Sequence, residues 1–405
     1  MTRLIFKQHC KMDFYKKWLL LFLLLPTLVW GQKQESQVGD TARYKSLIPE
    51  EKQGLLKNMS MIANMNFAFR NEFQDGEYKA SYFKNEQFRL EIRGMVHEKV
   101  YFRFRDRYTR AQTSESLDNL SRSTDLAYIR VDATKKFSFS AGKMCADWGA
   151  FEFDYNPIDI YEYSDIIEYA DNFLSGAGAS YMVNKKHQFT LQVLDSRTKT
   201  FDELYANQPQ FVEAKAPLAG VLNWRGSLLG GKLKTIWSYS LFTEAQNAYM
   251  NYLALGTELT LGKLVIAYDY KISGEQLDRT GIVSNTVPDS LYAYALTNTL
   301  YIGHWAHIHY RISTKINLSF FGMLDLAKWQ DDRMDQYGSS NNIRTAWGFI
   351  PTFEYYPWKD LNLRFFANYV GRVYNYSDAA EDRLGAKDYT TGRFCVGFVT
   401  PLGIF

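Results

Sequence analysis

The sequence predicts an all-β chain that closes into a transmembrane antiparallel β-barrel of 16 strands, with 18 strands as the second choice. Aromatic residues make up 16% of the chain and only 9 prolines occur, a composition that favours extended strands. Segments of about ten residues alternate apolar with polar side chains, and no run of 18 apolar residues is present. Because only helices and closed barrels satisfy their backbone groups in lipid, these observations together favour a barrel.

The N-terminal region has the layout of a secretory signal. Basic residues precede the apolar run 18–30, and Gly31 supplies a small residue for cleavage, so residues 1–31 are predicted to be a signal peptide. Residues 32–58 lack alternation and are interpreted as a periplasmic leader, which leaves 59–405 for the barrel. Without the signal the chain has 42 basic and 43 acidic residues. This balance gives no reason to expect a nucleic-acid partner.

The segment "EKVYFRFRDRYTR", residues 98–110, shows the alternation most clearly. Successive side chains of a strand point to opposite faces, so Phe102 and Phe104 share one face while three arginines share the other. In a barrel the apolar face meets lipid and the charged face meets the lumen. The same alternation predicts a set of basic residues that line the lumen: Arg89, Arg93, Arg103, Arg105, Arg107, Arg130, Arg311 and Arg364.

The length of the chain suits a wide barrel. Barrels of about 16 to 18 strands enclose an aqueous channel, whereas about eight strands fill with side chains. Residues 32–405 allow roughly 23 residues for each of 16 strands with its connection. Short turns at 184–187, 229–232 and 356–360 are expected at the periplasmic end. Longer polar connections at 111–123, 195–215, 274–290, 330–341 and 376–391 are expected outside.

One connection, residues 151–171, is acidic and contains no Lys or Arg. Its acids are Glu152, Asp154, Asp159, Glu162, Asp165, Glu168 and Asp171. A solvated external loop, or a surface that binds divalent cations and bridges lipopolysaccharide, would explain the charge. However, Tyr155, Ile158 and Tyr161 are interleaved with the acids, and apolar groups need something to pack on. The interleaved apolar residues therefore count against a free, solvated loop.

Several segments resemble the phosphate-selective porin O and P family, in its Bacteroidota branch. The resemblance is carried by "AYIRV" at 127–131, "FSFSAGK" at 137–143, "WGAFEFDYNPIDIYEYSD" at 148–165 and the paired segment 88–110. It implies a 16-stranded outer-membrane channel of a Gram-negative bacterium, usually trimeric, in which an inward loop narrows the pore. By position, the acidic residues 151–171 are expected to be that constriction loop. It also implies passive diffusion of small hydrophilic or ionic solutes, with an arginine ladder and a lysine group that attract anions such as phosphate. No concentrated lysine group is found, and the acidic segment argues against strong phosphate selectivity.

Two other functions are compatible with a secreted β protein. The first is an outer-membrane β-barrel enzyme, but no catalytic motif is found, and His97 and His187 fall in predicted periplasmic turns. The second is a secreted protein that binds glycans through exposed aromatic residues. No cofactor is predicted. His307 and His309 share a strand face near His304, but a metal site needs a third ligand that the sequence does not supply. The sequence leaves open whether Cys145 and Cys395 pair.

Overall fold

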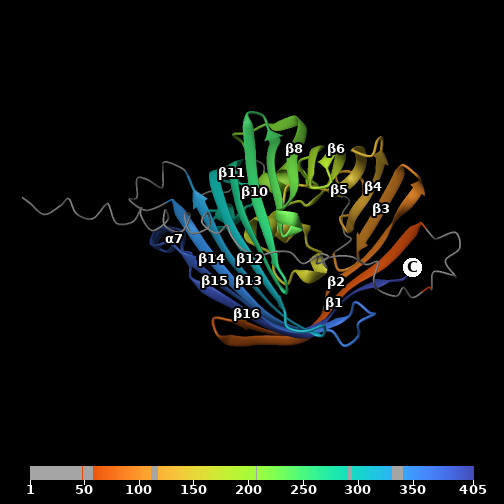
Figure 1. The fold of residues 1–405 in the computed structure, drawn as a ribbon. Helices are drawn as coiled ribbons and strands as arrows, with labels where there is room; N and C mark the ends of the chain where they lie inside the picture. The colour runs from red at the N-terminus through yellow and green to blue at the C-terminus, as the bar shows by residue number, and fades with distance from the viewer. Residues whose placement is uncertain (1–47, 49–57, 111–116, 207, 291–293, 331–340) are drawn as a thin grey trace, which may run out of the picture. The chain divides into compact units, whose positions relative to one another are not determined.

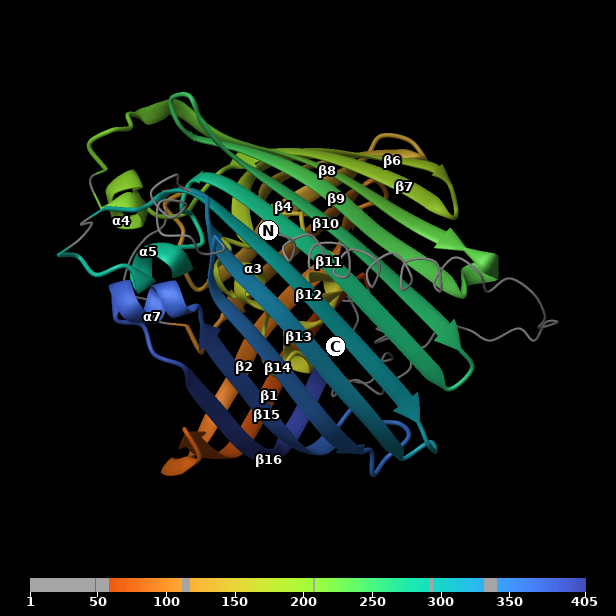
Figure 2. The ribbon, with the colours of Figure 1, turned by 90° about the vertical axis from the view of Figure 1, so that its left-hand side faces the viewer.

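The computed structural model describes residue 48 and residues 58–110, 117–206, 208–290, 294–330 and 341–405. Sixteen antiparallel strands form a closed barrel in which each strand pairs with its neighbours in sequence, and β16 pairs with β1 (Figures 1 and 2). The strands are Met59–Gln74 (β1), Glu77–His97 (β2), Val100–Arg107 (β3), Thr124–Asp132 (β4), Phe137–Cys145 (β5), Phe173–Asn184 (β6), His187–Asp195 (β7), Glu213–Leu228 (β8), Leu233–Ala245 (β9), Ala248–Leu261 (β10), Leu264–Leu277 (β11), Thr297–Arg311 (β12), Ile316–Trp329 (β13), Asn342–Tyr355 (β14), Arg364–Tyr376 (β15) and Tyr389–Gly403 (β16). The predicted strand number of 16 is confirmed.

Short helices occur in the connections. They are α2 (Phe151–Asp154), η4 (Pro157–Asp159), α3 (Asp165–Tyr169), α4 (Phe201–Tyr205), η5 (Leu229–Gly231), α5 (Ile282–Thr286) and α7 (Asp378–Leu384). Among the described residues, no helix is both long and apolar enough to span a membrane. The predicted signal peptide 1–31 and almost all of the predicted leader 32–58 lie outside the described residues.

The predicted long and short connections separate to opposite ends of the barrel. The five long connections follow odd-numbered strands, and the three short turns follow even-numbered strands. Because neighbouring strands run in opposite directions, all connections after odd-numbered strands lie at one end. Figure 2 shows α4, α5 and α7 gathered at that end.

The predicted alternation holds in the segment 98–110. Phe104 is 38% exposed on the outside of the barrel, whereas Arg105 is 8% exposed on the inside. The same pattern places Ile129, Leu191 and Val193 on the outside. Exposing so many large apolar side chains to water is energetically unfavourable, and the outer wall is therefore suited to contact with lipid.

The inner wall differs from the expectation of a uniformly polar lumen. Inward positions of β9, β10, β12 and β13 carry large apolar side chains, including Phe242, Tyr252, Trp305 and Phe321, all of which are buried. Such residues need a dry partner inside the barrel. That partner is the connection between β5 and β6.

Candidate functional site

The connection between β5 and β6, residues 146–172, folds into the lumen as predicted. Its helix α2 contacts β10 and β11, its 3₁₀ turn η4 contacts β1, β2 and β16, and α3 contacts β12. These strands lie on several sides of the barrel, so the segment crosses the lumen. We call residues 146–172 the constriction loop.

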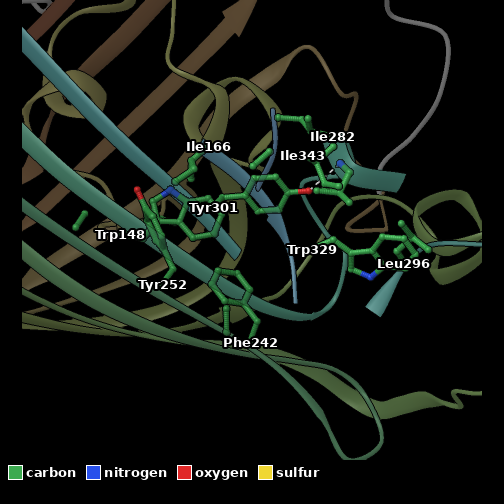
Figure 3. Close-up of a cluster of buried hydrophobic side chains, with 14 of the residues drawn as sticks. Trp148, Ile166, Phe242, Tyr252, Ile282, Leu296, Tyr301, Trp329 and Ile343 are labelled. Atoms are coloured by element: carbon green, nitrogen blue, oxygen red, sulfur yellow. Dashed lines mark hydrogen bonds between the residues drawn. The ribbon is translucent and has the colours of Figure 1, made fainter. Parts of the chain in front are cut away.

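Apolar side chains of the constriction loop pack on the inner wall. Trp148 is 3% exposed, and its ring lies 5.1 Å from the ring of Phe242 and 6.1 Å from that of Tyr252, measured between centroids (Figure 3). Ile166 joins the same cluster, together with Tyr301 of β12. The loop and wall thus share a hydrophobic core inside the barrel, which fixes the position of the loop.

Wall side chains also bind the loop backbone. The two carboxylate oxygens of Asp269 on β11 accept hydrogen bonds from the backbone N–H groups of Phe151 and Glu152, at 3.1 and 2.7 Å. On the other side of the lumen the amide of Asn66 donates to the carbonyl of Ile158 at 3.2 Å. These bonds provide partners for backbone polar groups that the apolar packing would otherwise leave buried without a hydrogen bond.

Most of the acidic side chains of the loop form ion pairs with cations of the barrel. Six of the seven do so: Glu152 with Lys271, Asp154 with Arg225, Asp159 with Arg364, Glu162 with Arg393, Asp165 with Arg344 and Arg372, and Asp171 with Arg279. The acidity of the sequence segment is therefore largely neutralised in the folded protein. The expectation that this segment repels anions does not follow from the structure, because its charge is already paired.

The pair between Lys271 and Glu152 is the most enclosed of these contacts. Both side chains are 0% exposed. Glu152 also accepts from the backbone N–H and the hydroxyl of Ser164, at 2.5 and 2.7 Å, and Lys271 donates to the Ser164 hydroxyl at 2.8 Å. One buried lysine thus joins the start of the constriction loop to the residue that precedes α3.

Sequence reasoning missed six of the cations that hold the constriction loop. Arg364 was among the predicted lumen residues, but Arg225, Lys271, Arg279, Arg344, Arg372 and Arg393 were not. A signal was available for Lys271, because Asp269, Lys271 and Ser273 alternate with apolar or aromatic residues in "AYDYKIS". The alternation predicts which way each cation points, but it does not predict the acidic residue with which the cation pairs.

The predicted arginine row lies on β2 and β3 and faces the lumen. The strand register places Arg89 opposite Arg107, Arg93 opposite Arg103 and Glu91 opposite Arg105. These five arginines share two carboxylates, Glu91 and the 0% exposed Asp125 of β4. The group therefore carries an excess of positive charge, and we call these seven residues the arginine cluster.

Contacts within the arginine cluster are short. Arg107 donates to Asp125 at 2.6 Å, and Arg105 and Arg89 lie 3.3 and 3.4 Å from the other oxygen of that carboxylate. Arg103 forms two parallel bonds to Glu91 at 3.1 and 2.9 Å. The buried Nη1 of Arg89 and Nε of Arg105 thus contact Asp125 as ion pairs without hydrogen-bond geometry, and the buried Nε of Arg107 has no hydrogen-bond acceptor among the described residues.

The other predicted basic residues lie elsewhere. Arg130 pairs with Asp132 at 2.9 Å near the turn after β4. Arg311 ends β12 at the same end of the barrel and donates to Asn317 at 3.3 Å. Arg364 pairs with Asp159 of the constriction loop and with Glu354 at 2.8 Å. The structure therefore brings together five of the eight predicted arginines, not all of them.

Glu168 is the loop acid that has no ion pair among the described residues. Its side chain is exposed, but the surrounding protein partly desolvates the carboxylate and raises its pKa above the ordinary value, and Glu162 raises it further while Arg107 acts in the opposite direction. Tyr163 also lies within electrostatic range of the arginine cluster, although burial raises its pKa to about 12. Glu168 is thus the loop carboxylate that brings an unpaired negative charge within electrostatic range of Arg107 of the arginine cluster.

The histidines and cysteines form no further site in the described part of the chain. His307 and His309 face the lumen with stacked rings 6.0 Å apart, whereas His304 contacts the hydroxyl of Tyr268, an outward-facing residue, at 2.8 Å. Among the described residues, no group of three His, Cys, Asp or Glu side chains is arranged to hold a metal. Cys145 and Cys395 are free thiols and are not bonded to each other.

A closed 16-stranded barrel with an apolar outer wall and an inward loop that narrows a charged lumen defines an outer-membrane channel of the porin class. The sequence matches the family model described as phosphate-selective porin O and P over residues 63–398, and the chain belongs to this family. A search of curated protein sequences finds no match.

Solved porin structures share the fold at low sequence identity. The outer-membrane channel DcaP of Acinetobacter baumannii is similar with a TM-score of 0.58 at 10% identity, covering 84% of this chain and 96% of that chain. An anion-selective porin from Comamonas acidovorans gives 0.56 at 9% identity, covering 84% and 98%. OmpF of Salmonella typhi, in complex with daunomycin, gives 0.54 at 11% identity, covering 84% and 98%. The protein is thus a porin of the Gram-negative outer membrane, and the secreted glycan-binding alternative is wrong.

Proposed function

We propose that this porin lets small hydrophilic solutes diffuse through its lumen with a preference for anions, including inorganic phosphate. The observation that carries the proposal is the arginine cluster, in which five guanidinium groups share two carboxylates beside the constriction loop. A positive wall with a low-dielectric surround raises the local concentration of anions. The pairing of the loop acids supports the same preference, because little negative charge is left to oppose it.

The test is a reversal potential measured across a planar bilayer in a KCl gradient. We expect the wild-type channel to pass chloride in preference to potassium, and to conduct in potassium phosphate. Replacing Arg103, Arg105 and Arg107 together by Ser should reduce the preference for chloride, because three lumen charges are lost while Glu91 and Asp125 remain. Arg130→Ser, at the far end of β4, is the matched control and should keep it. An unchanged reversal potential in the triple variant would reject this role of the arginines.

The chloride preference should also depend on pH through Glu168. A carboxyl with a raised pKa takes up its proton at a higher pH than an ordinary glutamic acid. As the pH falls from 7 toward 5, loss of this negative charge should increase the preference for chloride. The Glu168→Gln variant, which lacks this charge at any pH, should show at pH 7 the stronger preference for chloride that wild type reaches only near pH 5. If wild type and variant respond to pH equally, another group is responsible.

We infer that three copies of the chain associate, as the family resemblance implies, through the face formed by β3 to β7. These five strands have 8 to 12 residues, whereas β8 to β16 have 13 to 16. The wall formed by these short strands is lower than the rest of the barrel, so it would match the thickness of the hydrocarbon layer poorly. A neighbouring copy of the chain can cover it instead. Lipid and lipopolysaccharide would then contact the taller remainder.

Native mass spectrometry in detergent should give the mass of three chains. Replacing Ala177, an exposed residue at the centre of this face, by Arg should give single chains, whereas the same change at Leu324 of β13 should not. Single chains from the unaltered protein would contradict the assembly.

A further inference from the structure

A pocket of about 260 Å³ lies at the end of the barrel that carries the long connections, and of its lining residues only Arg344 takes part in the contacts described above. It is lined by residues of α3, of α5, of the start of β14, of the end of β15 and of the segment that ends α7. Figure 2 shows α5 and α7 next to each other at this end of the barrel. Because α3 belongs to the constriction loop, the pocket lies directly beside that loop.

The wall of the pocket is built and fixed. Leu384 and Ala386 line it and pack at their backs against the hydrophobic core inside the barrel. Gly385, with φ of 68°, ends α7 in the left-handed conformation, which turns the following residues toward the pocket. The hydroxyl of Thr286 donates to the carbonyl of Ile282 at 2.8 Å, so its oxygen lone pairs are presented as acceptors.

Two cations and no carboxylate line the pocket. Arg344 lines the pocket, and its bond from one terminal nitrogen to Asp165 holds the guanidinium group in place, with 8% of the side chain exposed. Lys387 is exposed and forms no ion pair with any described residue. A guanidinium group held in place and a second cation nearby provide a receptor for a carboxylate.

The remaining lining residues suit a ring that carries hydroxyl groups. Tyr169 and Tyr376 provide aromatic surface, and Asn285 and Thr286 provide amide and hydroxyl groups that can exchange hydrogen bonds. The volume is below the roughly 300–1,000 Å³ of pockets that hold drug-sized ligands, so it fits a solute the size of one sugar ring.

We propose that this pocket binds a monosaccharide-sized sugar carboxylate before it enters the constriction. The carboxylate lies between Arg344 and Lys387, the hydroxyls contact Asn285 and Thr286, and the ring packs on a tyrosine. This inference names a solute class for the proposed anion preference and rests on it. Because Arg344 also forms an ion pair with Asp165, the same guanidinium group would contact both the bound solute and the constriction loop.

Single-channel recording with glucuronate on the external side tests the proposal. We expect glucuronate at millimolar concentration to interrupt the current of the wild-type channel, and glucose to do so far less. Asn285→Leu, which removes the amide at nearly constant shape, and Lys387→Gln, which removes a cation, should each lower the frequency of interruptions by about ten-fold, as expected for loss of a hydrogen-bonded contact to the solute. Lys79→Gln, on the exposed hairpin between β1 and β2, is the matched control and should behave as wild type.

The outcomes separate this proposal from the anion preference itself. Open-channel conductance and reversal potential in KCl should be unchanged in Asn285→Leu, which shows that the barrel is intact. A chloride-selective channel that glucuronate does not interrupt overturns the pocket and leaves the anion preference standing. Interruptions that persist at full frequency in both variants, or that glucose causes equally, also overturn it. Interruptions that both variants abolish, in a channel without chloride preference, support the pocket and count against the proposed function.

Discussion

Replacing Lys271 by Met should loosen the constriction loop and destabilise the protein. The ammonium group lies fully buried against Glu152 and Ser164, so its removal leaves a buried carboxylate without its cation. Breaking such a pair costs about 3–5 kcal/mol. We expect a lower midpoint of unfolding in urea and a larger single-channel conductance, because β11 then holds the loop through Asp269 and no longer through the ion pair.

A double variant shows whether the charge itself is responsible. Lys271→Met combined with Glu152→Gln removes both charges and should recover much of the lost stability, since the amide can still bond to Ser164. Lys79→Met, which removes an exposed pair with Glu77 at 2.8 Å, should change stability by less than about 1 kcal/mol. If Lys271→Met has the unfolding midpoint and conductance of wild type, the buried pair does not anchor the loop.

Replacing Asp125 by Asn should make the channel more selective for anions and less stable. Asp125 is 0% exposed and lies within 3.4 Å of Arg89, Arg105 and Arg107. Without its charge, three neighbouring guanidinium groups repel one another and the lumen gains one unit of positive charge. We expect a stability loss of about 3 kcal/mol or more and a reversal potential shifted toward that of chloride.

The same substitution at Asp106 is the control for Asp125. Asp106 lies on the neighbouring strand and accepts a hydrogen bond from Ser123 at 2.9 Å, but it has no ion pair with any described residue. Its neutralisation should leave the reversal potential unchanged. A shift in the Asp106 variant equal to that in the Asp125 variant would show that the effect is general surface charge and does not come from the arginine cluster.

The strands and their faces could be predicted because they depend on local alternation. The arginine row of β3 and the outward phenylalanines beside it follow from the two-residue period of a strand alone. The isoleucines and tyrosines within the acidic segment argued against a free loop, since these side chains need a dry surface, and the family resemblance supplied the inward direction. Each of these signals lies within about 20 residues of sequence.

What the sequence could not supply were contacts between distant segments. Glu152 and Lys271 are 119 positions apart, and Asp165 and Arg372 are 207 apart, so nothing local relates one to the other. The inward aromatic residues of β9 and β10 violate the polar expectation for a lumen and are explained only by Trp148 packing on them. The pairing of β1 with β2 has a register shift between Asn66 and Phe67. This shift changes which residues of β2 point toward the lumen, and no clear local signal in the sequence indicates it.

The hydrophobic core between the constriction loop and the inner wall places the protein in two surroundings at once. Its outer surface depends on the bilayer, whereas the core around Trp148 and Phe242 is sealed from lipid by the wall, as in a water-soluble domain. Membrane thickness and acyl-chain composition therefore act on the strands and their tilt. The width of the passage should instead respond to conditions that weaken a protein core, such as urea, heat and pressure.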